Sequence, residues 1–398
     1  MSGPHVIIIG AGIGGLALAQ GLRKRGISFS VYERDALLDS RFQGNRIKIA
    51  GELRHKLVEL LNPEVWAILE ETSATTVVGE TNLRASDASI TACRRGRLPP
   101  GVGPPLTVDR GLLRYALITG IAEHVHFGHQ YERYELLEEE DNSKNDVRIF
   151  FGNGSVTEGT LLVGVDGARS RVREQLIPGP SYVEDTATCC IWGKSPLSTE
   201  LQDRFPARHR RWLTIVRDEA PLTFSIIAGD GPVTMVLEAC HFRNRDIHQH
   251  LPEDYVHWGI LFHKGLLRLN DEELDAALQD APKLALDLTA EWDPSIRSLL
   301  ELQNKTLTVG ARILSAPLKI PAWGTSSAVT VLGDAAHVMS PAGGAGAIAV
   351  LNDAYDLAST VKEKGISLGS ISEYEERMRA FAEVLLLRTN TAVMQMLG

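Results

Sequence analysis

Cysteine is scarce in this sequence, and the four cysteines have no spacing that suggests a metal site or a disulfide framework. Cys189 and Cys190 are adjacent, and the other two are Cys93 and Cys240. No Cys-x-x-Cys pair occurs, nor a group of cysteines and histidines with the spacing of a zinc site. We therefore predict reduced thiols, no bound metal and a cytoplasmic location.

Long apolar runs and an excess of basic residues are also missing. The apolar run at residues 5–10 is far shorter than a signal peptide or the roughly 18 residues of a membrane-spanning helix. Lysine and arginine number 41 against 50 acidic residues, which gives a formal net charge of −9. This balance argues against nucleic acid and anionic membranes as partners. We expect a monomer or homodimer without a membrane span, whose partners are small molecules.

The first residues of the chain have the pattern of a β-α-β unit. Residues 5–10 predict a buried parallel strand, residues 16–26 have helical spacing, and residues 28–35 predict a second strand. Between the first strand and the helix lies a Gly-x-Gly-x-x-Gly loop with glycines at 10, 12 and 15, and a further glycine at 14. In such loops the first glycine makes the turn, the second admits a pyrophosphate, and the third lets the helix pack on the strand. The loop therefore predicts a dinucleotide site.

An acidic residue stands where this type of site needs one. Glu33 follows the second strand, 18 residues after Gly15, at the place of an acid that binds ribose hydroxyls. Its charge would repel an adenosine 2′-phosphate, so the site is predicted to hold FAD or NAD rather than NADP. Only one such fingerprint is present, and a second dinucleotide domain is not expected.

Two further motifs lie downstream. Asp166-Gly167 ends a predicted buried strand and is followed by Arg169 and Arg171, and Gly333-Asp334 ends another and precedes Pro341. Together with the glycine loop, these motifs resemble in order and spacing those of the flavoprotein monooxygenases, the single-component FAD-dependent aromatic hydroxylase family. The resemblance covers nearly the whole chain and is greatest to fungal secondary-metabolite members.

The resemblance and the change in texture after residue 180 together predict an α/β fold. A Rossmann-like FAD-binding domain of the glutathione-reductase-like, aromatic-hydroxylase subtype is expected to carry an inserted, mostly antiparallel β-sheet substrate domain and C-terminal helices. The FAD-binding domain is predicted to comprise residues 1–75, 100–180 and 305–398, and the substrate domain residues 76–99 and 181–304.

The resemblance also implies a set of cofactor-binding residues. Asp334 would bind the hydroxyls of the flavin's ribityl chain, Arg110 and Arg46 would bond to phosphate or ribityl oxygens, and the loop after Pro341 would run beside the flavin ring. Asp166 could instead stabilise a turn at a strand end, and the two arginines could be surface residues. Many family members have asparagine where this chain has Ile348. The full predicted set is Gly10, Gly12, Gly14, Gly15, Glu33, Arg34, Arg46, Arg110, Asp166, Asp334, Pro341, Gly343, Gly344, Gly346 and Ala347.

By resemblance, NADPH or NADH reduces the flavin transiently, O2 then forms a flavin hydroperoxide, and one oxygen atom enters an electron-rich aromatic, polyketide-like or alkaloid-like molecule by hydroxylation or epoxidation. Arg46 and Lys194 are the predicted catalytic residues. Lys194 shares a strand face with Trp192 and could bind a phenolate, although both could also be ordinary sheet residues. His241 and Arg243 form a weaker candidate pair, and His337 is expected to be structural. A flavin oxidase or dehydrogenase without oxygen insertion, and an FAD-binding protein that catalyses a non-redox rearrangement, are the alternatives.

Overall fold

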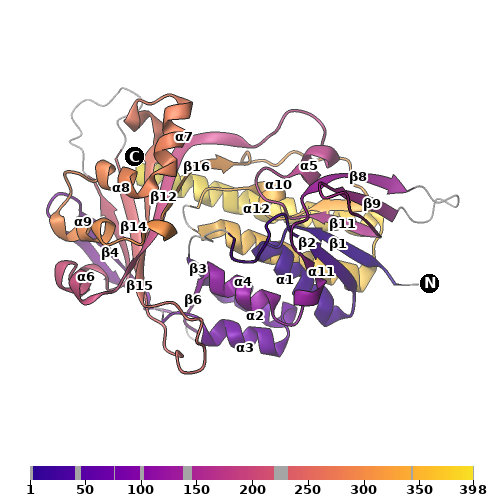
Figure 1. Ribbon diagram of the computed structural model, residues 1–398, viewed down its shortest axis with the longest axis horizontal. Coiled ribbons are helices and arrows are strands. Elements are labelled where there is room, and N and C mark those ends of the chain that lie inside the picture. Colours follow the sequence, from indigo (N-terminus) through magenta and orange to yellow (C-terminus); the bar gives the residue numbers. More distant parts are fainter. Residues whose placement is uncertain are drawn as a thin grey trace.

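Two large sheets lie toward opposite ends of the molecule (Figure 1). The structure is a computed structural model, and it describes residues 3–40, 46–75, 77–98, 103–137, 146–218, 232–341 and 344–397. One sheet is parallel and begins with the β-α-β unit of the N-terminus, and the other is mostly antiparallel. The predicted α/β class with an added antiparallel sheet is therefore confirmed.

The parallel sheet has five strands whose apolar side chains are covered on both faces. Helices α1 (Ile13–Arg25) and α11 (Ala345–Lys364) pack against each other and share its apolar core. Continuous runs of valine, isoleucine and leucine suit strands that are buried in this way. The strands in spatial order are β17 (Val329–Val331), β11 (Leu161–Gly164), β1 (His5–Ile9), β2 (Ser28–Tyr32) and β7 (Val125–His126).

A small antiparallel sheet stands beside the parallel one. The sequence Gly-Asn-Gly at residues 152–154 favours a hairpin turn, and the structure has a hairpin there between β9 and β10. The three strands are β8 (Tyr131–Leu137), β9 (Asp146–Phe151) and β10 (Val156–Gly159).

The second large sheet has seven strands, and all neighbours are antiparallel except β13 and β4. Strand β16, the last of this sheet in the sequence, follows the boundary predicted at residue 304 and yet pairs with β12 of the same sheet. The division into two domains itself remains a prediction. In spatial order the strands are β16 (Val309–Ser315), β12 (Glu184–Pro196), β15 (Tyr255–His263), β14 (Thr234–Cys240), β13 (Leu213–Arg217), β4 (Gly79–Arg84) and β5 (Ile90–Arg95).

Helices cover one face of this sheet, and the sequence prediction did not include them. Trp258, Ile260 and Phe262 of β15 point into the apolar core that the sheet shares with these helices. The helices are α6 (Thr199–Arg204), α7 (Asp271–Gln279), α8 (Ala281–Leu288) and α9 (Pro294–Glu301).

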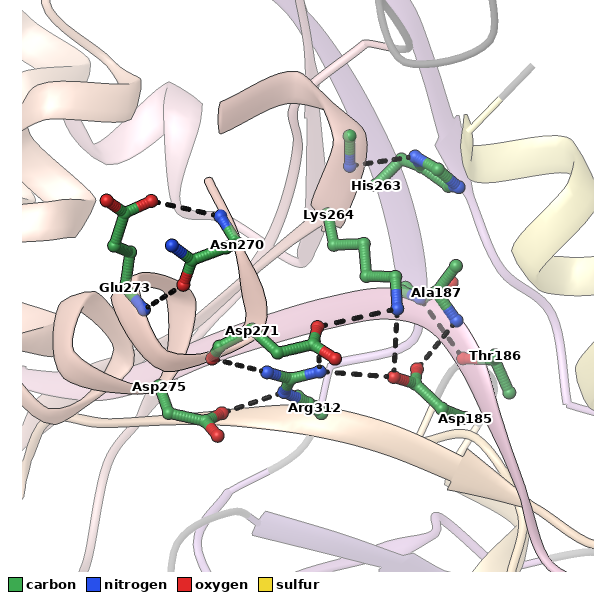
Figure 2. Close-up of polar contacts among 12 residues, drawn as sticks. Asp185, Thr186, Ala187, His263, Lys264, Asn270, Asp271, Glu273, Asp275 and Arg312 are labelled. Atoms are coloured by element: carbon green, nitrogen blue, oxygen red, sulfur yellow. Dashed lines mark hydrogen bonds and ion pairs between the residues drawn. The ribbon is translucent and has the colours of Figure 1, made fainter. Parts of the chain in front are cut away.

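Charged side chains attach α7 to the sheet in a group that we call the surface arginine cluster: Arg312, Asp185, Lys264, Asp271 and Asp275 (Figure 2). The Arg312 guanidinium donates to Asp271 and Asp275 at 2.7 Å each, and to Asp185 at 3.4 Å. Lys264 donates to Asp185 at 3.2 Å. Strand β16 thereby holds the first turn of α7 and the irregular start of β12 together.

The remaining elements connect the two sheets. Strands β3 (Arg46–Ile49) and β6 (Leu106–Asp109) form a short antiparallel ribbon, and each of them leads directly into a helix. The last helix, α12, reaches from the parallel-sheet end of the molecule to β15 (Figure 1). No helix in the described ranges is long and apolar enough to cross a membrane. The helices are α2 (Gly51–Leu60), α3 (Pro63–Glu71), α4 (Arg110–Ile118), α5 (Arg171–Leu176), α10 (Asp334–His337) and α12 (Leu368–Leu397), with 3-10 turns at Ala122–His124, Ala207–His209, Lys264–Leu267 and Lys305–Leu307.

Candidate functional site

A cavity of about 800 Å³ lies between the two large sheets. One end is formed by loops at the carboxyl ends of β1, β2, β11 and β17, which is where open parallel sheets bind their ligands. The other end is formed by one face of the seven-stranded sheet, and β3 contributes to the wall between them. Loops with phosphate-site glycines and a sheet face with apolar residues therefore open into the same space.

The glycine loop after β1 leaves room for a ligand at one position only. Gly10 has a φ of +113°, and a Cβ there would lie 2.4 Å from the Val165 carbonyl oxygen. At Gly15 a Cβ would lie 1.9 Å from the Gly10 carbonyl oxygen, because helix α1 packs tightly on the turn. At Gly12 nothing lies within 4 Å of an added Cβ, and this residue lines the cavity. The backbone at Gly12 and the start of α1 are thus open to an anionic group.

Two buried side chains hold the glycine loop in place. The carboxylate of Glu33 accepts a hydrogen bond from the Ala11 amide at 2.8 Å, and it lines the cavity. Arg114 donates to the Ala11 carbonyl from Nε at 3.1 Å and from its NH2 group at 3.0 Å. The sequence prediction missed Arg114. Its position one helical turn after Arg110 was the available signal, because residues at this spacing share a helix face.

The Gly333-Asp334 motif is fixed by a buried ion pair. Asp353 of α11 accepts from the Gly333 amide at 3.0 Å and contacts His337 Nε2 at 2.6 Å, and both side chains are buried. Burial alone would lower the pKa of His337, but the charge and hydrogen bond of Asp353 raise it above its usual value. His337 therefore supports the loop from behind, in keeping with the structural role expected of it, while Asp334 faces the cavity.

Arg110, at the start of α4, brings a cation to the same end of the cavity. Its Nε is buried and has no hydrogen-bond partner among the described residues. Burial lowers the pKa of the Arg110 guanidinium, and the negative charge of Asp334 opposes this shift. An unsatisfied buried donor beside a cavity is the mark of a ligand contact.

The loop after Pro341 lies along the cavity and ends at a helix N-terminus. Gly344, with a φ of +66°, precedes α11, and Gly346 and Ala347 of its first turn line the cavity together with Ile348. Gly343 lies outside the described residues. The unpaired amides at this N-terminus favour negative charge in front of them.

Asp166 has a structural use of its own. Its carboxylate accepts from the Ser170 hydroxyl, from the Arg171 amide at 2.8 Å and from the Val172 amide at 3.3 Å, so it caps the start of α5. Burial raises the pKa of Asp166, and these hydrogen bonds oppose the rise. It lines the cavity nevertheless, as Arg169 and Arg171 do.

The far wall of the cavity is a row of side chains that we call the apolar row. Val309, Trp192, Gly259, Val236 and Ile215 are direct cross-strand neighbours from β16 through β12, β15 and β14 to β13. All five line the cavity. Leu261 and Cys190 stand in the next row, and Met396 at the end of α12 covers them. This wall suits an apolar, flat molecule.

Beside the apolar row lies a second row, which we call the cavity charge row. In the sheet it consists of Lys194, His257 and Glu238, which are direct cross-strand neighbours. The β3–β6 ribbon faces it with three further charges, Arg46, Lys48 and Asp109. Glu238 pairs with Arg46, and with Lys48 at 2.7 Å. Lys194 pairs with Asp109, which also accepts from the Tyr255 hydroxyl at 2.7 Å.

Most of the predicted site residues meet in this cavity, and two of the described ones do not line it. Lys194 pairs with Asp109, and Gly15 is packed against Gly10. His241 and Arg243 are exposed, and His241 pairs with Asp254 at 2.9 Å. His257 and Lys48 also line the cavity, and the sequence prediction missed both. The predicted residues that do line the cavity are Gly10, Gly12, Gly14, Glu33, Arg34, Arg46, Arg110, Asp166, Asp334, Pro341, Gly344, Gly346 and Ala347.

Comparison with known proteins finds similarity to a nucleotide-binding domain and to FAD-dependent monooxygenases. A family model described as an NAD(P)-binding Rossmann-like domain matches residues 8–71. The chain is 40% identical over 373 residues to the dual O-methyltransferase/FAD-dependent monooxygenase elcB of Phaeosphaeria nodorum, and the match covers 88% of this chain and 39% of that protein. It is 29% identical to the FAD-dependent monooxygenase thnD of Trichoderma harzianum, covering 89% and 82% of the two chains. The chain thus spans less than half the length of its dual-function relatives.

The fold comparison covers nearly the whole chain. A solved structure from Photorhabdus luminescens, of a protein proposed to be an FAD-containing monooxygenase, matches with a TM-score of 0.78 and 26% identity. The match covers 98% of this chain and 99% of that one. The similarity therefore includes the seven-stranded sheet as well as the nucleotide-binding start.

Proposed function

We propose that this chain, which is similar to FAD-dependent monooxygenases, binds FAD and uses NAD(P)H and O2 to insert one oxygen atom into an electron-rich aromatic molecule. The observation that carries the proposal is the single cavity that joins the glycine loop, the Gly333-Asp334 loop and the apolar row. A separate nucleotide pocket would not need to open onto a sheet face. The fungal relatives favour a role in secondary metabolism.

The residues at the sheet's carboxyl edge fit FAD. The open backbone at Gly12 and the start of α1 suit the pyrophosphate, and Glu33 suits the ribose. The unsatisfied Arg110 Nε and the cavity-facing Asp334 suit phosphate and ribityl oxygens. We propose that the N-terminus of α11 faces the ring edge that gains negative charge on reduction.

Bound FAD, once reduced by NAD(P)H, supplies the activation of O2, and the chain's own residues supply the surroundings. Trp192, Leu261 and Met396 give the substrate side an apolar wall that excludes water. An O-methyltransferase needs a hydroxyl oxygen as acceptor, so the dual-function relatives favour a hydroxylated aromatic substrate or product for this chain as well. A cytoplasmic location and a monomeric or homodimeric state remain predictions that go with this function.

The test is to purify the chain, record its visible spectrum, and mix it with NADPH anaerobically in the presence of phenols and indoles. We expect a flavin spectrum, faster bleaching when the right compound is present, and label in the product when ¹⁸O2 is admitted. A colourless protein that takes up no FAD contradicts the proposal. Oxidation of NADPH that yields only hydrogen peroxide with every compound would favour an oxidase.

A pair of glycine variants separates loss of the cofactor from loss of the fold. Gly12→Val puts a side chain into the open space at the glycine loop, where nothing in the protein lies within 4 Å of its Cβ. We expect a folded protein that no longer binds FAD. Gly324→Val is the matched control, because its Cβ also meets nothing within 4 Å and Gly324 does not line the cavity. This variant should keep FAD.

A further inference from the structure

The last helix, α12, buries one face and leaves the opposite face in contact with water. The buried face packs on α11, and near the end of the helix Met396 lines the cavity. On the opposite face the apolar side chains of Val384, Leu387 and Met394 are 51%, 57% and 63% exposed. Apolar side chains that follow one another along an exposed face mark an interaction surface. The proposed function gives this face no role.

The spacing on this face is that of a coiled coil. Steps of four, three, four and three residues join five exposed residues that we call the α12 seam: Ala380, Val384, Leu387, Thr391 and Met394. In a coiled coil the contact positions a and d alternate in these steps, and the spacing assigns Val384 and Thr391 to position a. Leucine at d together with β-branched residues at a favours two parallel helices. The seam has both β-branched residues at a, and Leu387 stands at the central d position.

The side chains beside the seam carry charges that are complementary in a parallel pair. Glu383 precedes an a residue and is at position g, and Arg388 follows a d residue and is at position e. In parallel helices a g residue faces the e residue five positions later on the other helix, so Glu383 of one copy would face Arg388 of the other. Arg388 is exposed and forms no ion pair within the described part of the chain. Glu383 is half-buried, and its Oε1 accepts a hydrogen bond from the Ile320 amide at 3.0 Å.

We propose that two copies of this chain associate through their α12 seams, with the two helices parallel and related by a twofold axis. Antiparallel helices would instead bring each charged flank against the same flank of the other copy. Two heptads are few for an isolated coiled coil, because an isolated segment must also form its helix. Here the core already holds α12 as a helix, so association does not carry that cost.

The first test measures the mass of the FAD-loaded full chain by analytical ultracentrifugation over a range of concentrations. We expect a dimer that dissociates on dilution. Leu387→Glu should weaken association by about a hundredfold or more, because it places two carboxylates opposite each other at the centre of the seam. Val58→Glu is the matched control, because Val58 is an apolar residue of helix α2 that is 46% exposed. This variant should associate as the wild type does.

The second test exchanges the charges beside the seam. Arg388→Glu and Glu383→Arg each place like charges at both symmetric contacts, so each variant alone should associate about fivefold more weakly than the wild type. An equimolar mixture of the two variants places opposite charges at both contacts. The mixture should regain the affinity of the wild type by forming a dimer of one copy of each.

The direction of the helices is tested by a disulfide. Identical seam residues lie opposite each other in parallel helices, whereas in antiparallel helices the two Met394 positions lie at opposite ends of the seam. Met394→Cys should therefore give a disulfide-linked dimer in air, in a Cys93→Ser background that removes the exposed native thiol. Val58→Cys in the same background should stay unlinked.

The outcomes separate the dimer from other uses of the seam. A wild type that is monomeric at every concentration, or a dimer that Leu387→Glu leaves intact, overturns the proposal. A dimer in which Met394→Cys does not link contradicts the parallel arrangement. A monomer that sediments with phosphatidylcholine–phosphatidylserine vesicles, and loses this binding in Leu387→Glu, would assign the seam to a membrane surface instead. The test of flavin binding and oxygen insertion uses other measurements, so the dimer and the proposed function can fail separately.

Discussion

The cavity charge row and the surface arginine cluster lie on the same seven-stranded sheet and use the same kinds of side chain, yet their surroundings make them opposites. In the cavity charge row, cations outnumber carboxylates and the side chains are largely buried. In the surface arginine cluster, three carboxylates face two cations, and Asp271 and Asp275 are 75% and 60% exposed (Figure 2). Water screens the second group and leaves the first unscreened.

The pKa shifts of the two groups of charges differ in the same way as their burial. Burial alone would raise the pKa of Asp185 in the surface arginine cluster, but hydrogen bonds from the Ala187 amide, Lys264 and Arg312 lower it below its usual value, so the cluster stays charged. In the cavity charge row, burial and then the charges of Arg46 and Lys194 instead lower the pKa of His257. The exposed charges hold α7, β16 and β12 together. The buried charges beside the cavity instead affect which charge on a ligand group is favourable there.

The largest effect should come from breaking the buried row without touching the cavity. Among the residues that the structure describes, Lys194→Met leaves the buried Asp109 carboxylate with the Tyr255 hydroxyl and the α4 amides as partners. Removing one partner of a buried pair costs about 3–5 kcal/mol, and we expect a loss of unfolding free energy at the lower end of that range in urea titrations.

A double variant checks the cause of this loss. Adding Asp109→Asn to Lys194→Met removes the uncompensated charge and should restore part of the stability. A loss below about 1 kcal/mol for Lys194→Met alone would mean that the buried pair behaves like a surface pair.

The next largest change in unfolding free energy is expected from alanine substitutions at Gly193 and Gly259, which lie on adjacent strands and on opposite faces of the sheet. A Cβ at Gly193 would lie 2.5 Å from Trp258 Cζ2 on the packed face. Gly193→Ala should therefore cost about 1–3 kcal/mol of unfolding free energy through overpacking. Gly259→Ala on the cavity face, where an added Cβ would first meet the Ile191 carbonyl oxygen at 3.9 Å, should change the unfolding free energy by no more than about 0.5 kcal/mol. Equal losses of stability would contradict the open space over Gly259.

The third effect is the pH dependence of stability. Unfolded His257 takes up a proton below pH 6.5, whereas the folded protein resists this because the pKa of His257 is lowered by burial, Arg46 and Lys194. Stability should thus fall as the pH drops below 6.5, by up to about 1.4 kcal/mol per pH unit. In His257→Asn this fall should be smaller, as measured by urea unfolding across the pH range.

His337 is the matched control, because its pKa is shifted the other way. Its pairing with Asp353 outweighs burial and raises the pKa of His337, so its stabilisation is complete below pH 6.5 and is lost as the pH rises through the raised value. His337→Asn should flatten the profile above pH 6.5 and leave the acid side unchanged. The same change of slope in both variants would contradict the opposite environments.

The sequence predicts which residues line the glycine-loop end of the cavity better than which residues line the end at the seven-stranded sheet, and the reason is physical. The residues of the Gly10–Gly15 loop and of Gly333-Asp334 are neighbours in sequence, so their spacing carries the geometry. The cavity charge row takes one or two residues from each of five strands, and strand register brings them together. Strand β15 carries no alternation of apolar and polar residues that would reveal its register, because both of its faces are buried.

Helix starts show the limit of local patterns. Ser372 and Glu375 have the spacing of a capping box, but α12 begins at Leu368 and both residues lie inside it. Ser367 and Ser370 bond to each other's backbone amides at the actual start, at 3.0 and 3.2 Å. Glu375 is instead buried and accepts from Thr330 and Thr325, so this local pattern does not mark the start of the helix.

The smallest effect should come from the surface arginine cluster. Arg312→Met removes the guanidinium that joins Asp185, Asp271 and Asp275, and Lys264 remains to offset part of their repulsion. Exposed pairs contribute little because water and salt screen them. We expect a loss of unfolding free energy far below that of Lys194→Met, and one that high salt abolishes. Since salt cannot reach the cavity charge row in the same way, the loss in Lys194→Met should persist at high salt, and a loss that salt abolished in both variants would remove the distinction between the two groups of charges.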